Sequence, residues 1–261
     1  MTRVEARPPV VLLHSIGTDG SMWRDQSEAL GEDGREVLVY DSPGHGGRTS
    51  VERVGIDEWV EDLRSWLLPR TSSAVHLVGL SMGGVQALAY TLAHPSSVCS
   101  IVLADTFCRL EPAVADAKVS GIRAGVAAQP MADYAQSYLN ETLMSQSGEG
   151  RRDELAASIA AVTPASYVAS AEACFRVDLA DRLSEVSVPT LVVIGELDAK
   201  TPIALSNELV AGIPGAGLAH IAQAGHLSCV DSPEEFTRVL KNHLHTVESR
   251  PVAAAVDGDV R

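Results

Sequence analysis

A serine between two glycines, at the junction of a strand-like run and a helix-like run, most constrains what this chain can fold into. Residues 75–80 form a continuous apolar run that predicts a buried strand, and apolar residues then recur at offsets of three, four and seven, typical of a helix. Ser81 lies at the junction, with Gly79 and Gly83 two residues away on either side. This spacing indicates a turn so tight that only residues without a Cβ fit beside the serine.

Such a turn would expose the Ser81 hydroxyl and direct the first N–H groups of the following helix at the same point. Unpaired N–H groups and the helix dipole stabilise an anion that forms there. The five residues alone also fit a glycine-rich connection in any α/β protein, so the rest of the chain has to decide between the two interpretations.

Strand-like and helix-like runs alternate along most of the chain. The predicted strands are the apolar runs at residues 10–14, 37–41, 75–80, 101–104, 189–195 and 218–221. Because these runs are continuous rather than alternating, they favour a parallel sheet that helices cover on both faces. We therefore predict an α/β fold with a mostly parallel sheet of about six strands.

Residues 107–183 interrupt this alternation. The segment is rich in alanine, has helical spacing and contains no strand-like run. We predict that it forms a helical cap inserted into a core made of residues 1–106 and 184–245. Residues 246–261 have no periodicity, so we predict a disordered tail there.

Charge and cysteine content restrict the possible partners. A formal net charge of −14 argues against binding to nucleic acid or to an anionic membrane surface. No run approaches the ~20 apolar residues of a membrane span, and residues 1–9 lack a signal-peptide core. Cys99, Cys108, Cys174 and Cys229 are scattered without metal-binding spacing. They predict reduced thiols in a cytoplasmic protein without a metal, and the sequence leaves a homodimer open.

A serine hydroxyl needs a base to become a nucleophile, and the base needs an acceptor that orients it. In open parallel sheets, functional groups collect after the carboxyl ends of the strands. Asp198 follows the fifth predicted strand and His226 follows the sixth. The order Ser81, Asp198, His226 predicts nucleophile, orienting acid and base. Glu196 is the rival acid, but the shorter Asp198 carboxylate suits a fixed orienting role better.

Three other histidines lie near predicted strand ends. His14 ends the first strand and is expected to shape the loop after it. His45 lies between two glycines and is interpreted as a structural turn residue. His76 begins the strand that leads to Ser81, so it belongs to the opposite edge of the sheet.

Two backbone N–H groups are predicted to form an oxyanion hole, which binds the carbonyl oxygen that becomes negative during acyl transfer. One belongs to Met82, directly after the nucleophile. The other is expected in the loop after the first strand, where the sequence His-Ser-Ile-Gly makes the N–H of Ile16 the candidate.

With these motifs, the chain resembles the α/β-hydrolase family over about residues 8–245, and within it the 3-oxoadipate enol-lactonases. The segments that carry the resemblance are 14–19 followed by Met22-Trp23, then 79–84, 167–173, 195–202 and 224–228. The resemblance implies the α/β-hydrolase fold, and hydrolysis of a small lactone or carboxylic ester through an acyl-enzyme. It implies no metal and no organic cofactor.

The chain departs from those lactonases in three respects. Only nine residues precede the first strand, so the antiparallel hairpin with which family members begin is missing or vestigial. Pro43 stands where the lactonases carry arginine. Their cap tends to carry a Trp-Phe pair, whereas no tryptophan follows Trp66 here.

An enol-lactone bears a carboxylate, for which arginine is the preferred partner. We therefore name Arg109, Arg123 and Arg176 of the predicted cap, with Trp23, as candidate substrate contacts. A neutral ester remains an open alternative, because the protein itself is strongly acidic.

Other activities fit the same motifs. A cofactor-free perhydrolase or haloperoxidase would have the same Ser-Met-Gly-Gly turn, and a C–C bond hydrolase of dienone acids would use the same three side chains. A ligand-binding receptor on this fold is an alternative of another class. The complete set of Ser81, Asp198 and His226 argues against it, since a receptor has no need of all three.

Overall fold

A computed structural model describes residues 7–144 and 149–249. Its centre is a sheet of six parallel strands in the order β2-β1-β3-β4-β5-β6. The strands are β1 (Val10–Leu13), β2 (Val37–Tyr40), β3 (Val75–Leu80), β4 (Val98–Ala104), β5 (Thr190–Gly195) and β6 (Gly217–Ile221). The predicted α/β fold class is confirmed. Within the described residues all strand pairs of the sheet are parallel.

Strand β4 begins three residues before the predicted start. In the sequence, the polar Ser100 directly precedes the apolar run that predicted this strand. In the structure Ser100 is fully buried, and its hydroxyl pairs with Nδ1 of His76 on the neighbouring strand at 2.8 Å. A polar residue thus fits inside a buried strand because the adjacent strand supplies its hydrogen-bond partner.

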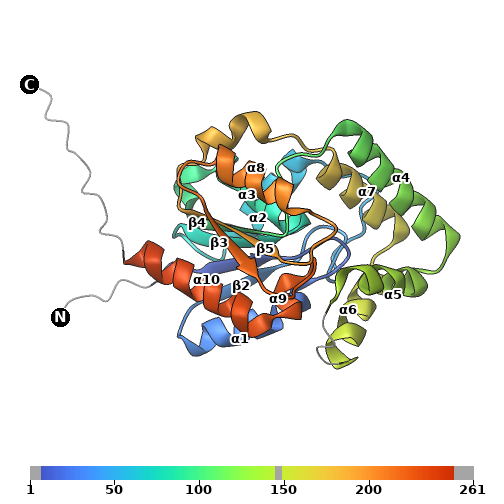
Figure 1. Cartoon of the computed structure of the whole chain (residues 1–261), viewed down its shortest axis with the longest axis horizontal. Helices are drawn as coiled ribbons and strands as arrows, with labels where there is room; N and C mark the ends of the chain where they lie inside the picture. Colours follow the sequence, from blue (N-terminus) through green and yellow to red (C-terminus); the bar gives the residue numbers. More distant parts are fainter. Residues whose placement is uncertain (1–6, 145–148, 250–261) are drawn as a thin grey trace, which may run out of the picture.

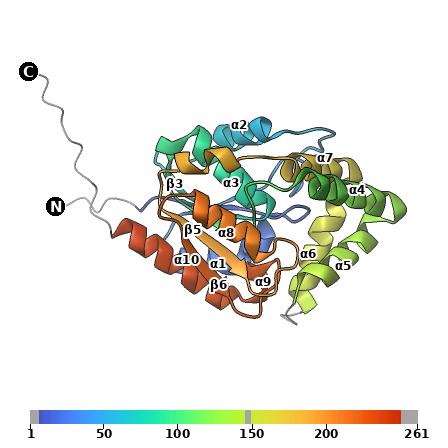
Figure 2. The same cartoon turned by 45° about the horizontal axis from the view of Figure 1, so that its top comes forward.

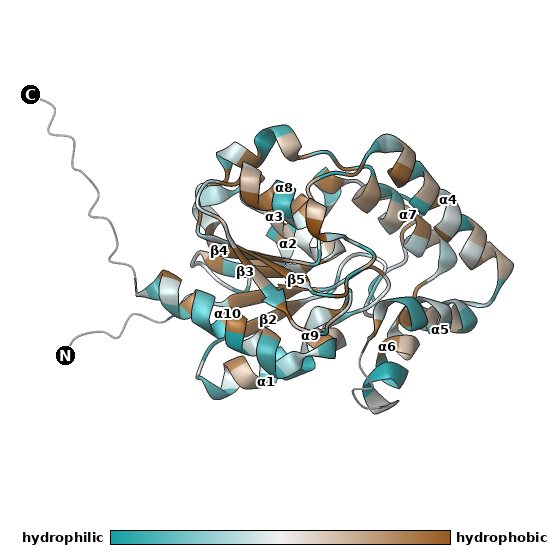
Figure 3. Ribbon diagram, viewed as in Figure 1, coloured by the Kyte–Doolittle hydropathy of each residue, from teal (hydrophilic) through white to brown (hydrophobic). Residues whose placement is uncertain are grey.

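Helices cover both faces of the sheet (Figures 1 and 2). One face carries α1 (Arg24–Glu32), the short α9 (Ser228–Asp231) and α10 (Pro233–Glu248); the other carries α2 (Ile56–Leu67), α3 (Met82–Ala93) and α8 (Ile203–Gly212). Short 3₁₀ helices at Gly20–Trp23, Pro95–Ser97 and Ala180–Glu185 join these elements. Figure 3 shows hydrophobic colour concentrated on the strands and hydrophilic colour on the outer side of α10. This is the pattern expected of a sheet that is buried between two layers of helices.

Residues 246–248, which the sequence analysis placed in the disordered tail, are helical instead. Helix α10 continues to Glu248, where the carboxylate accepts a 2.9 Å hydrogen bond from the buried guanidinium of Arg35. This ion pair and the fully buried Leu244 hold the last turns of the helix against the core. The remainder of the predicted tail, residues 250–261, lies outside the described residues.

Among the described residues, four α-helices lie between β4 and β5 in the chain: α4 (Pro112–Ala128), α5 (Met131–Thr142), α6 (Glu149–Ala161) and α7 (Pro164–Phe175). We call these four helices the cap. Figures 1 and 2 show them together at one end of the molecule, beyond the sheet. An antiparallel bridge between Arg109 and Asp178 joins the segment that leads into the cap to the segment that leaves it. Over the described residues, no helix is both long and apolar enough to cross a membrane.

Three buried histidines make the stability of the fold dependent on pH. Burial lowers the pKa of His14 to about 4, of His45 to about 3 and of His76 to about 4. The unfolded chain binds protons at these side chains near pH 6.5, whereas the folded chain binds them only near pH 3–4. The stability that the neutral imidazoles contribute is therefore complete above pH 6.5 and is lost as the pH falls from 6.5 towards 4.

We expect the free energy of unfolding, measured with urea, to fall steeply between pH 7.5 and pH 5. Each of the three histidines should contribute on the order of 1 kcal/mol per pH unit in this window. His76→Asn, which keeps a partner for Ser100, should remove about a third of that slope, and the exposed control His220→Asn should leave it unchanged. An unfolding free energy that is flat across this range would contradict the assignment of neutral, buried imidazoles.

Candidate active site

The turn between β3 and α3 holds Ser81 in a strained backbone conformation. Its φ of 56° lies in the left-handed region that side chains other than glycine rarely adopt. A Cβ on Gly79 would lie 2.1 Å from the carbonyl oxygen of Gly83, and a Cβ on Gly83 would lie 2.2 Å from that of Leu13. The sequence prediction of a turn without room for flanking side chains therefore agrees with the structure.

Backbone hydrogen bonds fix this strained residue on both sides. The N–H of Ser81 donates to the carbonyl of Ala104 at 2.9 Å, and the hydroxyl of Thr106 donates to the carbonyl of Ser81 at 2.7 Å. Both partners lie at the end of β4, so the neighbouring strand sets the orientation of Ser81.

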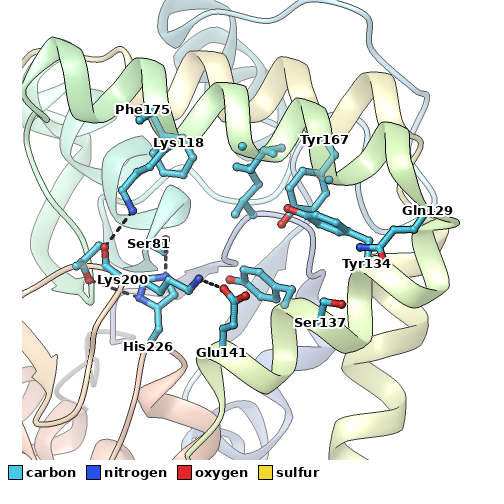
Figure 4. A pocket seen from close by; sticks show the side chains of 17 residues that line it. Ser81, Lys118, Gln129, Tyr134, Ser137, Glu141, Tyr167, Phe175, Lys200 and His226 are labelled. Carbon is cyan, nitrogen blue, oxygen red and sulfur yellow. Dashed lines mark hydrogen bonds and ion pairs between the residues drawn. The ribbon is translucent and has the colours of Figure 1, made fainter.

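The structure brings Ser81, His226 and Asp198 together from three separate strand ends, and Figure 4 shows Ser81 and His226 side by side. Nε2 of His226 lies 3.0 Å from the hydroxyl oxygen of Ser81, and Nδ1 of His226 lies 3.0 Å from Oδ2 of Asp198. The three residues are only 4%, 4% and 8% exposed. This is a continuous hydrogen-bonded relay from carboxylate to imidazole to hydroxyl, the arrangement that activates a serine nucleophile.

Asp198 is held as an anion by its surroundings. Its Oδ1 accepts backbone N–H groups of Lys200 and Thr201 at 2.8 and 3.0 Å, and its Oδ2 accepts the Thr201 hydroxyl as well as His226. Burial alone would raise the pKa of Asp198, but the bonds and charge from His226 and the bonds from Thr201 lower it to about 2. The rival acid Glu196 accepts from the N–H of Gln223 instead.

A second buried carboxyl, Asp105, links the loops that carry the acid and the base. It accepts the N–H of Gly195 at 2.8 Å and the hydroxyl of Ser228, and it is fully buried. Burial, and then the charge of Asp198, raises the pKa of Asp105 well above its usual range. The sequence analysis missed this residue, although its position directly after β4 is a recognisable signal.

The two N–H groups predicted for the oxyanion hole belong to Ile16 and Met82. Ile16 lines the cavity in front of Ser81, and Met82 is the first residue of α3, whose N–H points out of the helix end. In the described part of the chain, neither N–H donates to a loop or turn acceptor. The predicted positions are thus structurally compatible with binding a carbonyl oxygen.

Two neutral histidines hold the loop that contains Ile16. Nε2 of His45 accepts the N–H of Gly17 at 3.1 Å, and Nε2 of His14 accepts the N–H of Ser42 at 2.9 Å. Burial lowers the pKa of both imidazoles, which keeps these nitrogens available as acceptors. The structural roles expected for His14 and His45 agree with these contacts.

A cavity of about 430 Å³ opens in front of Ser81, between the cap and the carboxyl ends of the strands. From the core it is lined by Ile16, Ser81, Lys200, Thr201 and His226. From α4, α5 and α7 it is lined by Ala117, Lys118, Gly121, Ile122, Gly125, Gln129, Tyr134, Ser137, Tyr138, Glu141, Tyr167 and Phe175. The volume fits a small molecule, and the lining mixes aromatic with polar side chains, as ligand sites do.

The four residues expected to contact a substrate do not line this cavity. Trp23 is fully buried and packs against Phe236, with ring centroids 5.7 Å apart. The three arginines point to the outer surface, where acidic neighbours hold them: Arg109 pairs with Glu208, Arg123 with Glu172 and Arg176 with Asp116. These arginine side chains are 45%, 61% and 56% exposed. Their charge and their position in the cap segment did not indicate which way these side chains point.

Two lysines line the cavity instead, and the sequence analysis did not single them out. Lys118 lies on α4 and Lys200 in the loop after β5. The helical spacing of Lys118, Ile122 and Gly125 marks one face of α4, and that of Tyr134, Tyr138 and Glu141 marks one face of α5. This spacing could have identified the two helix faces from the sequence, although it does not show which part of the structure each face packs against. In the described ranges, no group of His, Cys, Asp and Glu side chains is placed to hold a metal ion.

The alpha/beta hydrolase fold family matches residues 8–233. Among individual proteins, 3-oxoadipate enol-lactonase 1 of Acinetobacter baylyi is 25% identical, over 94% of this chain and 91% of its own. A protein of Azorhizobium caulinodans named for carbamate hydrolysis is 29% identical, over 90% of each chain. The crystal structure of an enol-lactonase from Burkholderia xenovorans LB400 superposes with a TM-score of 0.81 at 26% identity, covering 93% of both chains.

Proposed function

Because this chain belongs to the α/β-hydrolase family, we propose that it is a serine hydrolase that cleaves a small lactone or carboxylic ester through an acyl-enzyme. One observation carries the proposal: the hydroxyl of Ser81, the imidazole of His226 and the carboxylate of Asp198 form a relay with two 3.0 Å steps at the floor of a cavity. The similarity to enol-lactonases supports a lactone as the first substrate to try, namely 3-oxoadipate enol-lactone.

In the proposed reaction, Nε2 of His226 takes the proton of Ser81 as its oxygen attacks the carbonyl carbon. The carbonyl oxygen becomes negative, and the N–H groups of Ile16 and Met82 stabilise it. The tetrahedral intermediate collapses, the bond to the alcohol or enol oxygen breaks, and His226 returns the proton to that oxygen. Asp198 keeps the imidazole oriented and stabilises its positive form throughout.

Water then completes the cycle. His226 takes a proton from a water molecule, the hydroxide oxygen attacks the acyl carbon, and the bond to Ser81 breaks as the serine oxygen regains its proton. The acid product leaves, and the relay is restored. In this scheme the protein's own side chains supply every proton transfer.

Covalent labelling tests this proposal directly. A fluorophosphonate, which reacts only with activated serines, should label the protein, and mass spectrometry should place the label on Ser81. The labelled protein should lose turnover of p-nitrophenyl acetate and of the enol-lactone in parallel. Label on another serine, or no label and no turnover of any ester or lactone, would overturn the proposal.

A substrate panel separates the alternatives that share this site. It should contain p-nitrophenyl esters, the enol-lactone, an N-alkyl carbamate, a ring-cleavage dienoate, and peroxide with acetate. Fastest turnover of an ester or lactone supports the proposal, whereas fastest turnover of the dienoate or of peroxide assigns the site to C–C hydrolysis or perhydrolysis. Ligand binding without turnover of any member would favour the receptor alternative.

A further inference from the structure

The catalytic cavity contains one ammonium group without a carboxylate partner. The chain has three lysines, and two of them, Lys118 and Lys200, line this cavity although the protein carries a formal net charge of −14. Lys200 forms an ion pair with Glu141 across the cavity. Within the described ranges, no carboxylate lies within ion-pair distance of the Lys118 ammonium.

Lys118 is held in place by contacts that leave most of its hydrogen-bonding capacity unused. Its ammonium lies 5.5 Å from the centroid of the Phe175 ring and donates to the backbone carbonyl of Lys200 at 3.3 Å. An ammonium has three N–H donors, and this single long bond uses one of them. Figure 4 shows the side chain extending from α4 towards the end of the cavity where Ser81 and His226 lie.

The carboxylates near this end already have partners of their own. Glu141, the one carboxylate among the described lining residues, is paired with Lys200. Asp198 is occupied by His226, by Thr201 and by backbone N–H groups. The charged residues that line the cavity, Lys118, Lys200 and Glu141, therefore sum to one positive charge, in a protein with a formal net charge of −14.

We propose that Lys118 binds an anionic substituent, a carboxylate, on the lactone or ester substrate. This inference rests on the proposed hydrolase function and specifies the substrate class: an ester or lactone that carries its carboxylate a few bonds from the reacting carbonyl. The opposite end of the cavity, with Gln129, Ser137 and Tyr134, lies away from Lys118 in Figure 4 and carries no charge. The anion and the reacting carbonyl thus occupy the same end.

This arrangement explains how an acidic protein can accept an acidic substrate. Desolvation makes an ammonium–carboxylate contact stronger in a part-buried cavity than at the surface. Lys118 of the cap then takes the role that was expected for an arginine of the cap, and the Phe175 ring lies beside its ammonium. Lys118 discriminates between substrates by their charge, whereas the relay of Ser81, His226 and Asp198 is common to charged and neutral ones.

The test compares pairs of esters that differ in one charge. Monoethyl succinate and ethyl pentanoate place the difference on the acyl side; 3-acetoxypropanoate and propyl acetate place it on the alcohol side. For each ester, kcat/KM is measured by alkali uptake at constant pH. The wild type should prefer the anionic member of at least one pair, and Lys118→Met should reduce that preference about 10- to 100-fold. Turnover of the neutral member should stay within about threefold.

Two further variants separate charge recognition from a purely structural role. Lys118→Arg keeps the positive charge and should retain most of the preference. Lys241→Met removes the lysine that pairs with Asp33, outside the cavity, and should leave the preference unchanged. An equal loss on both members of each pair in Lys118→Met would mean that the residue only joins α4 to the loop of Lys200. That result, or an unchanged preference, would overturn the proposal.

A binding measurement distinguishes failure of this inference from failure of the proposed function. In the Ser81→Ala background, calorimetric titration with monoethyl succinate should give an affinity at least about tenfold weaker when Lys118→Met is added. If the wild type hydrolyses no ester but this affinity difference is found, the hydrolase proposal fails and the anion site stands. If esters are hydrolysed without any effect of Lys118 on charge preference or binding, only the anion site is wrong.

Discussion

Replacing Ser81 with alanine is expected to lower kcat for the ester or lactone substrate by about 10⁴-fold or more. The variant keeps the backbone turn and the two candidate N–H donors but loses the oxygen that forms the acyl-enzyme. What turnover remains would come from the oxyanion hole and from substrate binding, so KM should change little. The measurement is steady-state turnover of the best substrate from the panel, with active-site titration to exclude contaminating wild-type enzyme.

If the three residues act as one relay, the losses in kcat caused by substituting two of them should not add. His226→Gln should cost about as much as Ser81→Ala, and the double variant should be no worse than either, because each change disables the same proton transfer. Ser170→Ala is the matched control. It removes the hydroxyl of a fully buried serine that has no hydrogen-bond partner among the described residues and does not line the cavity, so it should keep wild-type kcat. A Ser81→Ala variant with more than a tenth of wild-type turnover would remove the acyl-enzyme mechanism.

Gly83→Ala is expected to be among the most damaging single-methyl substitutions at the described glycines. Helix propensity alone predicts a gain of roughly 1 kcal/mol, since Gly83 lies in the first turn of α3. The added Cβ would instead lie 2.2 Å from the carbonyl oxygen of Leu13 and 2.9 Å from that of His14. Both are backbone atoms of strand β1 and the loop after it, so neither can rotate away. We expect a loss of at least ~3 kcal/mol in unfolding free energy, together with loss of activity.

The matched control for this prediction is Gly31→Ala in α1. That helical glycine has no atom within 4 Å of an added Cβ, so propensity should prevail and the variant should gain up to roughly 1 kcal/mol. Urea unfolding of both variants at pH 7.5 gives the two values. If Gly83→Ala were as stable as Gly31→Ala, the close approach of α3 to β1 at the Ser81 turn would be wrong.

The triad positions were accessible from sequence because each depends on a local rule. Ser81 is marked by glycines that its own turn requires, and Asp198 and His226 directly follow predicted strands. Parallel strands end at one edge of a sheet, so residues far apart in the chain had to meet there if the strand order was favourable. Chain order then predicted which side chain serves as acid and which as base.

The substrate contacts could not be predicted in the same way. Arg109, Arg123 and Arg176 were expected near a substrate because of their charge and their location in the cap segment. Each lies instead on an outward face, next to an acidic residue from another element or from a later part of the chain. Which face of α4 opposes Ser81 depends on how four helices pack over the sheet, and helical periodicity defines a face without defining its neighbour.

The sequence by itself determined the α/β class, the parallel sheet and the tight turn at Ser81, and it predicted which carboxyl and which imidazole lie beside that serine. These follow from steric limits at glycine and from hydrophobic periodicity, both of which act within a few residues of the chain. Only the tertiary structure decided that Lys118 lines the cavity in front of Ser81, that Asp105 joins the loops of Asp198 and His226, and that His45 supports the loop of Ile16. Those contacts join segments between 28 and 123 residues apart, and their free energies arise from packing and burial, which no local pattern records.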